Sequence, residues 1–219
     1  MEITYLGHSC FKLKSKDGLI VYMDPFKTEM VGLPLPKDVA DVITISHAHE
    51  DHSATSVITG PVNRAETFLI NKVGEYEIAG VQISATGTFH DKTNGSERGK
   101  NLLISVVMDG LHLVHLGDLG TKLTDSQVEK LGAVDVLMIP VGGHFTIDAE
   151  EALDLLKEIQ PSYAIPMHYK TAESKIDGLA GLDSFLEKNK YPLAGESVHK
   201  IKLDENSLPD DTQILLMNG

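Results

Sequence analysis

The sequence predicts a protein of the α/β or α+β class whose sheets are covered on both faces. Of its 219 residues, 42% are hydrophobic and 23% are charged, which is typical of a globular chain and not of a disordered one. Short β-like runs fill the first half, whereas strands and amphipathic helices alternate in the second. Because no repeat, low-complexity tract or linker divides the chain, we expect residues 1–219 to form a single domain. Each half could supply one sheet.

Strands in the first half are predicted from β-branched or alternating runs that end at turn residues. The first three runs are Glu2–Leu6, Cys10–Lys14 and Leu19–Met23. Segment 26–40 contains two prolines and is expected to be a loop, and Asp41–Ser46 is nearly all apolar, as in a strand that is buried on both faces. Asp109-Gly110 and Lys16-Asp17-Gly18 are hairpin signals. Further strands are expected at Thr67–Ile70, Glu75–Ile78, Val81–Thr86, Asn101–Met108 and Leu111–Leu116.

Helices become frequent after residue 120. Apolar residues at helical spacing predict helices at Thr124–Leu131 and Asp148–Ile159, each beginning at a residue that caps helices well. A third helix is expected at Leu179–Lys188. The remaining strands are expected at Asp135–Ile139, Tyr163–Met167, Val198–Leu203 and Gln213–Met217.

Charge and cysteine content narrow the classes of function. The chain carries 32 acidic and 19 basic residues, a net charge of −13, which argues against a protein that holds nucleic acid through phosphate contacts. Its one cysteine, Cys10, excludes an internal disulfide framework and a cysteine-based zinc finger. With no signal peptide and no apolar stretch long enough to cross a membrane, we expect a cytoplasmic protein that acts on a small molecule. Homo-oligomerisation stays open.

The most informative motif is His47-Ala48-His49-Glu50-Asp51-His52, which directly follows the buried strand. Side chains of a strand repeat every second residue, so His47 and His49 would point the same way and bind one ion together. Asp51 and His52 follow in a turn and can reach a second ion. The alternative is a solvated polar loop, but three histidines and an aspartate in this pattern seldom occur by chance.

Four ligands in one loop do not complete two metal sites, so further ligands should follow at later strand ends. Three residues meet this condition: His90, Asp118 and His168. His115 competes with His90 as the third ligand of the first ion. It lies three residues before Asp118 in the same strand, roughly 10 Å from it at about 3.3 Å per residue, and among apolar neighbours. We therefore predict that His90 is the ligand.

This arrangement resembles the metallo-β-lactamase superfamily over nearly the whole chain. The flanking segments GHSCF, DPF, GDLG, PVGGHFTID and IPMHY are similar to those of its metal-dependent hydrolase branch. That branch is similar in turn to the ascorbate-phosphate lactonases and to the phospholipase D that hydrolyses N-acyl-phosphatidylethanolamines. The resemblance implies a four-layer αβ/βα sandwich with a two-metal site at one edge of the sheets.

Carried over to this sequence, the resemblance assigns each ligand. One metal would take His47, His49 and His90, the other Asp51, His52 and His168, and Asp118 would bridge them. A metal-bridging hydroxide would then attack a small phosphodiester, lactone or ester. Nitrogen and oxygen ligands suit Zn²⁺, our first expectation, and also Mn²⁺, Fe²⁺ or Ni²⁺.

Several residues outside the set of predicted metal ligands have two possible roles. His8 and His144 lie in glycine-bearing turns and are candidates for catalysis in the substrate pocket, or loop histidines that stabilise their own turns. Asp24 either orients a ligand imidazole or simply ends a strand. Loop Asp91–Lys100, which carries Lys92, Arg98 and Lys100, either binds an anionic substrate group or is a solvated loop. Two rival functions remain: a di-iron redox or oxygen-handling protein, and a metal-binding module without turnover.

Overall fold

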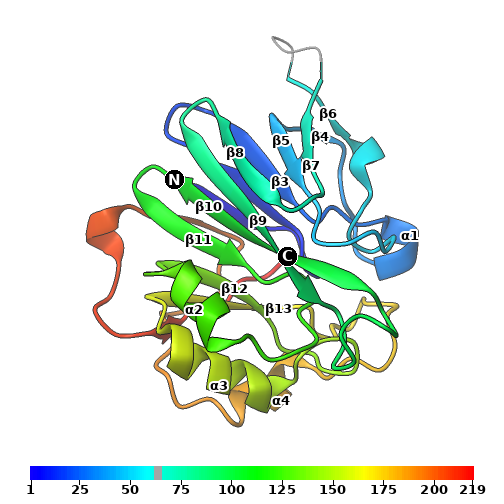
Figure 1. Ribbon diagram of the computed structural model, residues 1–219, viewed down its shortest axis with the longest axis vertical. Coiled ribbons are helices and arrows are strands. Elements are labelled where there is room, and N and C mark those ends of the chain that lie inside the picture. The colour runs from blue at the N-terminus through cyan, green and yellow to red at the C-terminus, as the bar shows by residue number, and fades with distance from the viewer. Residues whose placement is uncertain (62–65) are drawn as a thin grey trace.

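Two mixed β-sheets pack face to face at the centre of the structure (Figure 1). The structure is a computed structural model that describes residues 1–61 and 66–219. The first sheet has the order β14-β1-β2-β3-β5-β7 and the second the order β15-β13-β12-β11-β10-β9-β8. In each sheet an antiparallel part, made of hairpins, adjoins a parallel part.

The strands of the first sheet are β1 Glu2–Tyr5, β2 Phe11–Lys14, β3 Ile20–Met23, β5 Val42–Thr44, β7 Phe68–Ile70 and β14 Lys200–Lys202. Those of the second are β8 Gly74–Ile78, β9 Val81–Phe89, β10 Lys100–Met108, β11 Leu111–His115, β12 Val136–Pro140, β13 Tyr163–Met167 and β15 Gln213–Ile214. A separate pair joins β4 Asp38–Val39 to β6 Ile58–Thr59. The helices are α1 Thr28–Val31, α2 Asp125–Leu131, α3 Ala149–Ile159 and α4 Leu182–Leu186, with short 3₁₀ turns at Thr55–Val57 and Glu205–Ser207.

Apolar side chains divide the molecule into the expected layers. Between the sheets lies a core to which both contribute, including Leu13 and Val21 from the first and Ile104 from the second. The other face of the second sheet packs against α2, α3 and α4, which Figure 1 shows gathered on one side. The other face of the first sheet is covered by α1 and the loop after it, where Leu33 and Leu35 are buried. The parallel parts of both sheets are therefore covered on both faces, as predicted, whereas the outer face of β8 and β9 is exposed at Glu75, Glu77 and Gln82.

Two helices begin where the sequence predicts and for the predicted reason. Thr124 and Asp148 each cap a helix. In both caps the side chain of the capping residue accepts from the backbone N–H of the third helical residue, and the side chain of that third residue accepts from the backbone N–H of the capping residue. Asp109 and Gly110 both have positive φ, 56° and 83°, as the tight β10–β11 hairpin requires. The hairpin signals and the capping signals are thus confirmed.

Five expectations need correction. The strands expected at Val198–Leu203 and Gln213–Met217 are shorter, since only Lys200–Lys202 and Gln213–Ile214 pair as β14 and β15. Segment 26–40 is not all loop, because it contains α1 and β4; α1 has only four residues and no side-chain cap, so no local signal marked it. Strand β9 continues past Thr86 to Phe89, since β10 pairs with it up to the Lys100–Phe89 position. The third helix is shorter than Leu179–Lys188 and begins at Leu182, after Gly181.

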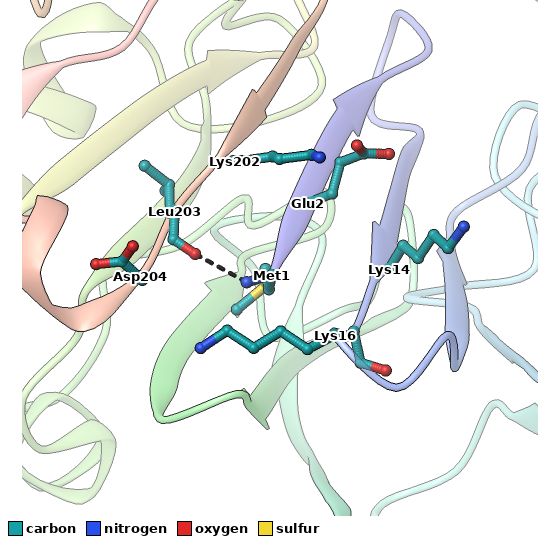
Figure 2. A pocket seen from close by; sticks show the side chains of 8 residues that line it. Met1, Glu2, Lys14, Lys16, Lys202, Leu203 and Asp204 are labelled. Atoms are coloured by element: carbon teal, nitrogen blue, oxygen red, sulfur yellow. Dashed lines mark hydrogen bonds between the residues drawn. The ribbon is translucent and has the colours of Figure 1, made fainter.

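The last part of the chain returns to the first strand. Figure 2 shows β14 beside β1, with the amino group of Met1 donating to the carbonyl of Leu203 at 2.8 Å. The same amino group lies 3.2 Å from Asp109 in the β10–β11 hairpin, so it also links the two sheets. Within the part of the chain that the structure describes, none of the helices has the length and apolar character needed to cross a membrane.

Candidate metal centre

The predicted ligands all stand where a strand gives way to a loop. His47, His49, Asp51 and His52 lie in the loop after β5, which belongs to the first sheet. The second sheet supplies the others: His90 follows β9, Asp118 lies just after β11, and His168 follows β13. Residues far apart in sequence therefore meet at one edge of the sandwich, between the two sheets.

The side chains form three overlapping groups whose ligating atoms lie within 4.8 Å of one another. The first group is His47, His49 and His90; the second is His8, Asp51, His52 and His168; the third, made of Asp24, His47 and His52, shares a residue with each of them. The first two groups contain the two sets expected for two metals, with His8 added to the second.

Asp118 lies between the two groups and is only 2% exposed. Its Oδ2 is 3.3 Å from His90 Nε2 in the first group and 3.2 Å from His168 Nε2 in the second, and its Oδ1 is 3.3 Å from His52 Nε2. The backbone N–H of Asp118 donates to Asn101 Oδ1 at 3.0 Å, which holds the loop in place. One carboxylate thus faces both halves of the site, which is the position that a bridging ligand needs.

Hydrogen bonds at the Nδ1 atoms orient three of the imidazoles. His52 Nδ1 donates to Asp24 at 2.9 Å, His47 Nδ1 contacts Ser46 Oγ at 2.9 Å, and His90 Nδ1 donates to the carbonyl of Phe145 at 3.1 Å. Asp24 is itself fixed, because it accepts from the backbone N–H of Ser46 at 2.7 Å. With Nδ1 occupied, each ring presents Nε2 to the centre of the site, which is the usual arrangement of histidines that bind a metal.

The unpaired atoms at the centre fit a bound cation. Four buried side-chain atoms here make no hydrogen bond within the described residues: His8 Nε2, His47 Nε2, His52 Nε2 and Asp118 Oδ1. Leaving buried polar atoms unpaired costs about 1–3 kcal/mol each, and a divalent ion bound to nitrogen and oxygen donors would satisfy several at once. The donor set therefore fits a metal such as zinc.

Charge in the cluster follows from burial and close packing. Burial lowers the pKa of His47 to about 3, so this imidazole is neutral and keeps its lone pair for a ligand. Burial opposes the charge on His52, but Asp118 and Asp24 outweigh it and raise its pKa well above the ordinary value. Burial likewise disfavours charge on Asp118, yet His168 and His52 hold its pKa well below the usual range.

Backbone strain concentrates at the site. His8, Asp24 and His168 have positive φ of 55°, 46° and 54°, a conformation that non-glycine residues seldom adopt. The carbonyl of His8 accepts from the backbone N–H of His168 and from the hydroxyl of Tyr5, both at 2.8 Å. These bonds hold the strained turns of the two sheets against each other.

The other three candidate histidines lie in different surroundings. His8 is buried in the second group, with Nε2 3.4 Å from Asp51. His144 is exposed, rests on the neighbouring ring of Phe145, and is not among the residues that line the cleft over the site. His115 lies below the site with both nitrogens used: Nε2 donates to the carbonyl of Ser9 at 2.9 Å, and Nδ1 accepts from Gly117 at 3.0 Å.

A cleft of about 470 Å³ opens above the two groups. Its wall combines candidate ligands with the apolar side chains of Met30, Phe145 and Ile176 and with Arg98. Sequence reasoning missed this apolar wall, and also Ser46 and Asn101, because nothing in their local pattern separates them from ordinary core or loop residues. The position of Ser46 directly before His47 was the only available signal.

Known proteins are similar to this chain in sequence. A family model described as the beta-lactamase superfamily domain matches residues 2–168. A UPF0173 metal-dependent hydrolase of Thermoplasma acidophilum is 32% identical over 190 residues, which cover 78% of this chain and 84% of that protein. One from Carboxydothermus hydrogenoformans is 32% identical over 196 residues, with coverage of 78% and 85%.

A solved structure extends the similarity to the full chain. The crystal structure of a candidate Zn-dependent hydrolase of the metallo-β-lactamase superfamily from Thermotoga maritima matches with a TM-score of 0.77 and 34% identity. The match covers 99% of this chain and 97% of that one.

Proposed function

This chain belongs to the UPF0173 metal-dependent hydrolase family of the metallo-β-lactamase superfamily, and from that membership we propose that it hydrolyses a small phosphodiester, lactone or ester with about two bound divalent ions. The observation that carries the proposal is the position of Asp118, whose two oxygens face His90 on one side and His52 and His168 on the other. A carboxylate placed between two groups of donors is what a two-metal site requires.

Each set of residues has a role in this proposal. His47, His49 and His90 would hold one ion, Asp51, His52 and His168 the other, and Asp118 both. When bound, such ions supply Lewis acidity and a water acidic enough to act as nucleophile near neutral pH. Zn²⁺ is our first expectation, and the same nitrogen and oxygen ligands also suit Mn²⁺, Fe²⁺ and Ni²⁺.

Protein groups complete the chemistry. Asp24 and Ser46 keep the rings of His52 and His47 in one orientation, so that ligand geometry does not change during turnover. His8, with Nε2 beside Asp51, is positioned to exchange a proton at that carboxylate or at a leaving group nearby. With a substrate bound, the apolar wall of the cleft would reduce the water around the reacting groups, which would strengthen charge interactions there.

The size and charge of the protein favour a small substrate. A cleft of about 470 Å³ has the volume of an ordinary small-molecule site. The net charge of −13 would repel a long polyanion everywhere outside the metal centre. We therefore propose a small-molecule partner and no nucleic acid.

Hydrolysis by the reconstituted protein tests the proposal. Protein loaded with Zn²⁺ or Mn²⁺ is assayed with bis(4-nitrophenyl) phosphate and with simple lactones, beside a chelator-treated sample. The expected result is hydrolysis of at least one substrate that disappears with chelator and returns with metal. A protein that binds metal but hydrolyses none of them would favour the non-catalytic module, and iron-specific spectra of protein as purified would favour the redox alternative.

A further inference from the structure

The cleft over the site contains one basic side chain among the described residues that line it, that of Arg98. Among these described lining residues, Glu50 is the one acidic residue outside the ligand set, and its carboxylate lies 2.5 Å from the amine of Lys27. In a chain with a net charge of −13, a lone arginine beside a catalytic centre is a local exception. A basic side chain at this position suggests a role in binding an anionic group.

The guanidinium of Arg98 is held in place by an aromatic ring, and its N–H donors remain available to a ligand. It lies over the ring of Phe145, 5.5 Å from the ring centre, and is about one-third exposed. Its ion pair with Glu97 spans 3.9 Å, which is too long for a hydrogen bond. Stacking on an aromatic ring leaves the planar edge of a guanidinium free, and that edge matches the two oxygens of a carboxylate or phosphate.

Both the loop that carries Arg98 and the ring on which Arg98 lies are linked to the candidate ligand His90. Asp91, directly after His90, is buried and accepts from the backbone N–H groups of Thr93, Gly95 and Arg98, each at 2.8 Å. Phe145, on which the guanidinium lies, is the residue whose carbonyl orients His90. Arg98 is therefore held at a fixed place relative to a candidate ligand, as a specificity-determining residue must be.

We propose that Arg98 binds a carboxylate or phosphate of the substrate that is separate from the group being hydrolysed. The substrate class is then a small ester, lactone or phosphodiester with a second, anionic end. Its apolar part would face Met30, Phe145 and Ile176, which form the rest of the wall. This inference rests on the proposed function, since it assumes that the reacting group lies at the metal centre.

Binding of two-ended probes tests it without relying on turnover. Zinc-loaded protein is titrated by calorimetry with ω-phosphonocarboxylic acids that have one, two or three methylene groups, and with alkylphosphonates of the same lengths. In both series the phosphonate can reach the metals, but only the first has a second anion. A parallel series of alkane bisphosphonates distinguishes a phosphate-like second end from a carboxylate.

The expected result is that at least one two-ended probe binds about tenfold more tightly than its one-ended partner. Arg98→Met should abolish that preference while leaving alkylphosphonate affinity unchanged, and Arg98→Lys should restore part of it. Lys92→Met is the matched control, because Lys92 lies in the same loop but pairs with Glu151 on α3, and it should keep the full preference.

Three results would overturn the inference. They are equal affinity for one-ended and two-ended probes at every length, a preference that survives Arg98→Met, and an equal loss in Lys92→Met. In each of these cases the alkylphosphonates still bind, so the proposed metal centre stands. Failure of zinc-loaded protein to bind any phosphonate would instead count against the proposed function, and the inference would fall with it.

Discussion

At the scale of single residues, Asp118 is the group on which both halves of the site depend. Its oxygens lie within 3.3 Å of nitrogens of His52, His90 and His168. Asp118→Asn keeps the shape of the side chain but removes its charge. We expect hydrolysis to fall by at least about 100-fold and metal content to drop, as measured by assay and by elemental analysis.

A control variant tests whether loss of a carboxylate charge matters only at Asp118. Glu77→Gln removes a carboxylate from an exposed position of β8, and it should leave both metal content and rate unchanged. If Asp118→Asn hydrolysed at near the wild-type rate, Asp118 would have no place in the mechanism.

A second residue-scale prediction concerns His90 and His115. His90→Ala should lower metal content and activity together, because His90 Nε2 faces Asp118 in the cluster. His115→Ala should retain metal but reduce the free energy of unfolding by about 1–3 kcal/mol, since it leaves the Ser9 carbonyl and the Gly117 N–H unpaired. Elemental analysis and urea unfolding check the pair. The opposite pattern, an emptied site in His115→Ala alone, would contradict the assignment.

His8 and His144 show what could not be read from local sequence. Both sit in glycine-bearing turns and both have positive φ, yet His8 is buried in the cluster and His144 is exposed. The difference arises from contacts with distant elements, because the carbonyl of His8 is held by the backbone of His168. Local pattern selects residues that can do chemistry, but tertiary packing decides which of them meet.

At the scale of elements, the ligands are placed by loops that pack closely at strand ends. Gly120 lies against the backbone of His90, and a Cβ at this position would be 2.3 Å from the His90 carbonyl. Gly120→Ala should therefore push His90 out of place, with a loss of about 1–3 kcal/mol in stability and a clear fall in metal affinity. Thermal unfolding and zinc titration measure the two effects.

Gly87→Ala is the matched control for this prediction. Gly87 lies on β9, the strand that leads to His90, and its added Cβ would meet only ordinary contact with Val73 at 3.5 Å. This variant should bind zinc like the wild type. Unchanged zinc affinity in Gly120→Ala would show that the loop tolerates displacement and that close packing does not set the geometry of the site.

Elements were predictable where the chain carries its own signals. Thr124 and Asp148 begin α2 and α3, and the Asp109-Gly110 turn joins β10 to β11, because capping and turn preferences act over a few residues. By contrast, α1 has no side-chain cap at its start and β9 passes through Gly87, so these depend more on neighbours distant in sequence. The fold followed from pattern and resemblance, whereas the cleft wall did not.

At the scale of the whole molecule, the buried histidines link stability to pH. Burial lowers the pKa of His47 to about 3 and that of His8 to about 4, whereas both titrate near 6.5 in an unfolded chain. Below pH 6.5 the unfolded chain therefore binds more protons than the folded one. Their contribution to stability is complete above that pH and is lost as pH falls toward 4 and 3.

This linkage predicts how the metal-free protein melts. The melting temperature of chelator-treated wild type should drop between pH 6.5 and pH 4.5, and His47→Gln should show a smaller drop because it lacks one of the titrating groups. His52, whose pKa is raised, acts in the opposite sense, but its contribution is lost only as pH rises above 6.5. Identical pH profiles for wild type and His47→Gln would contradict the prediction.

If both sheets together build one site for two metal ions, the metal content per chain will show it. Protein is stripped with chelator, reconstituted with Zn²⁺ or Mn²⁺, dialysed and measured by elemental analysis against protein concentration. Because seven predicted ligands are too many for one tetrahedral ion, we expect about two ions per chain. A content that stays below one ion per chain after reconstitution with either metal would contradict the account.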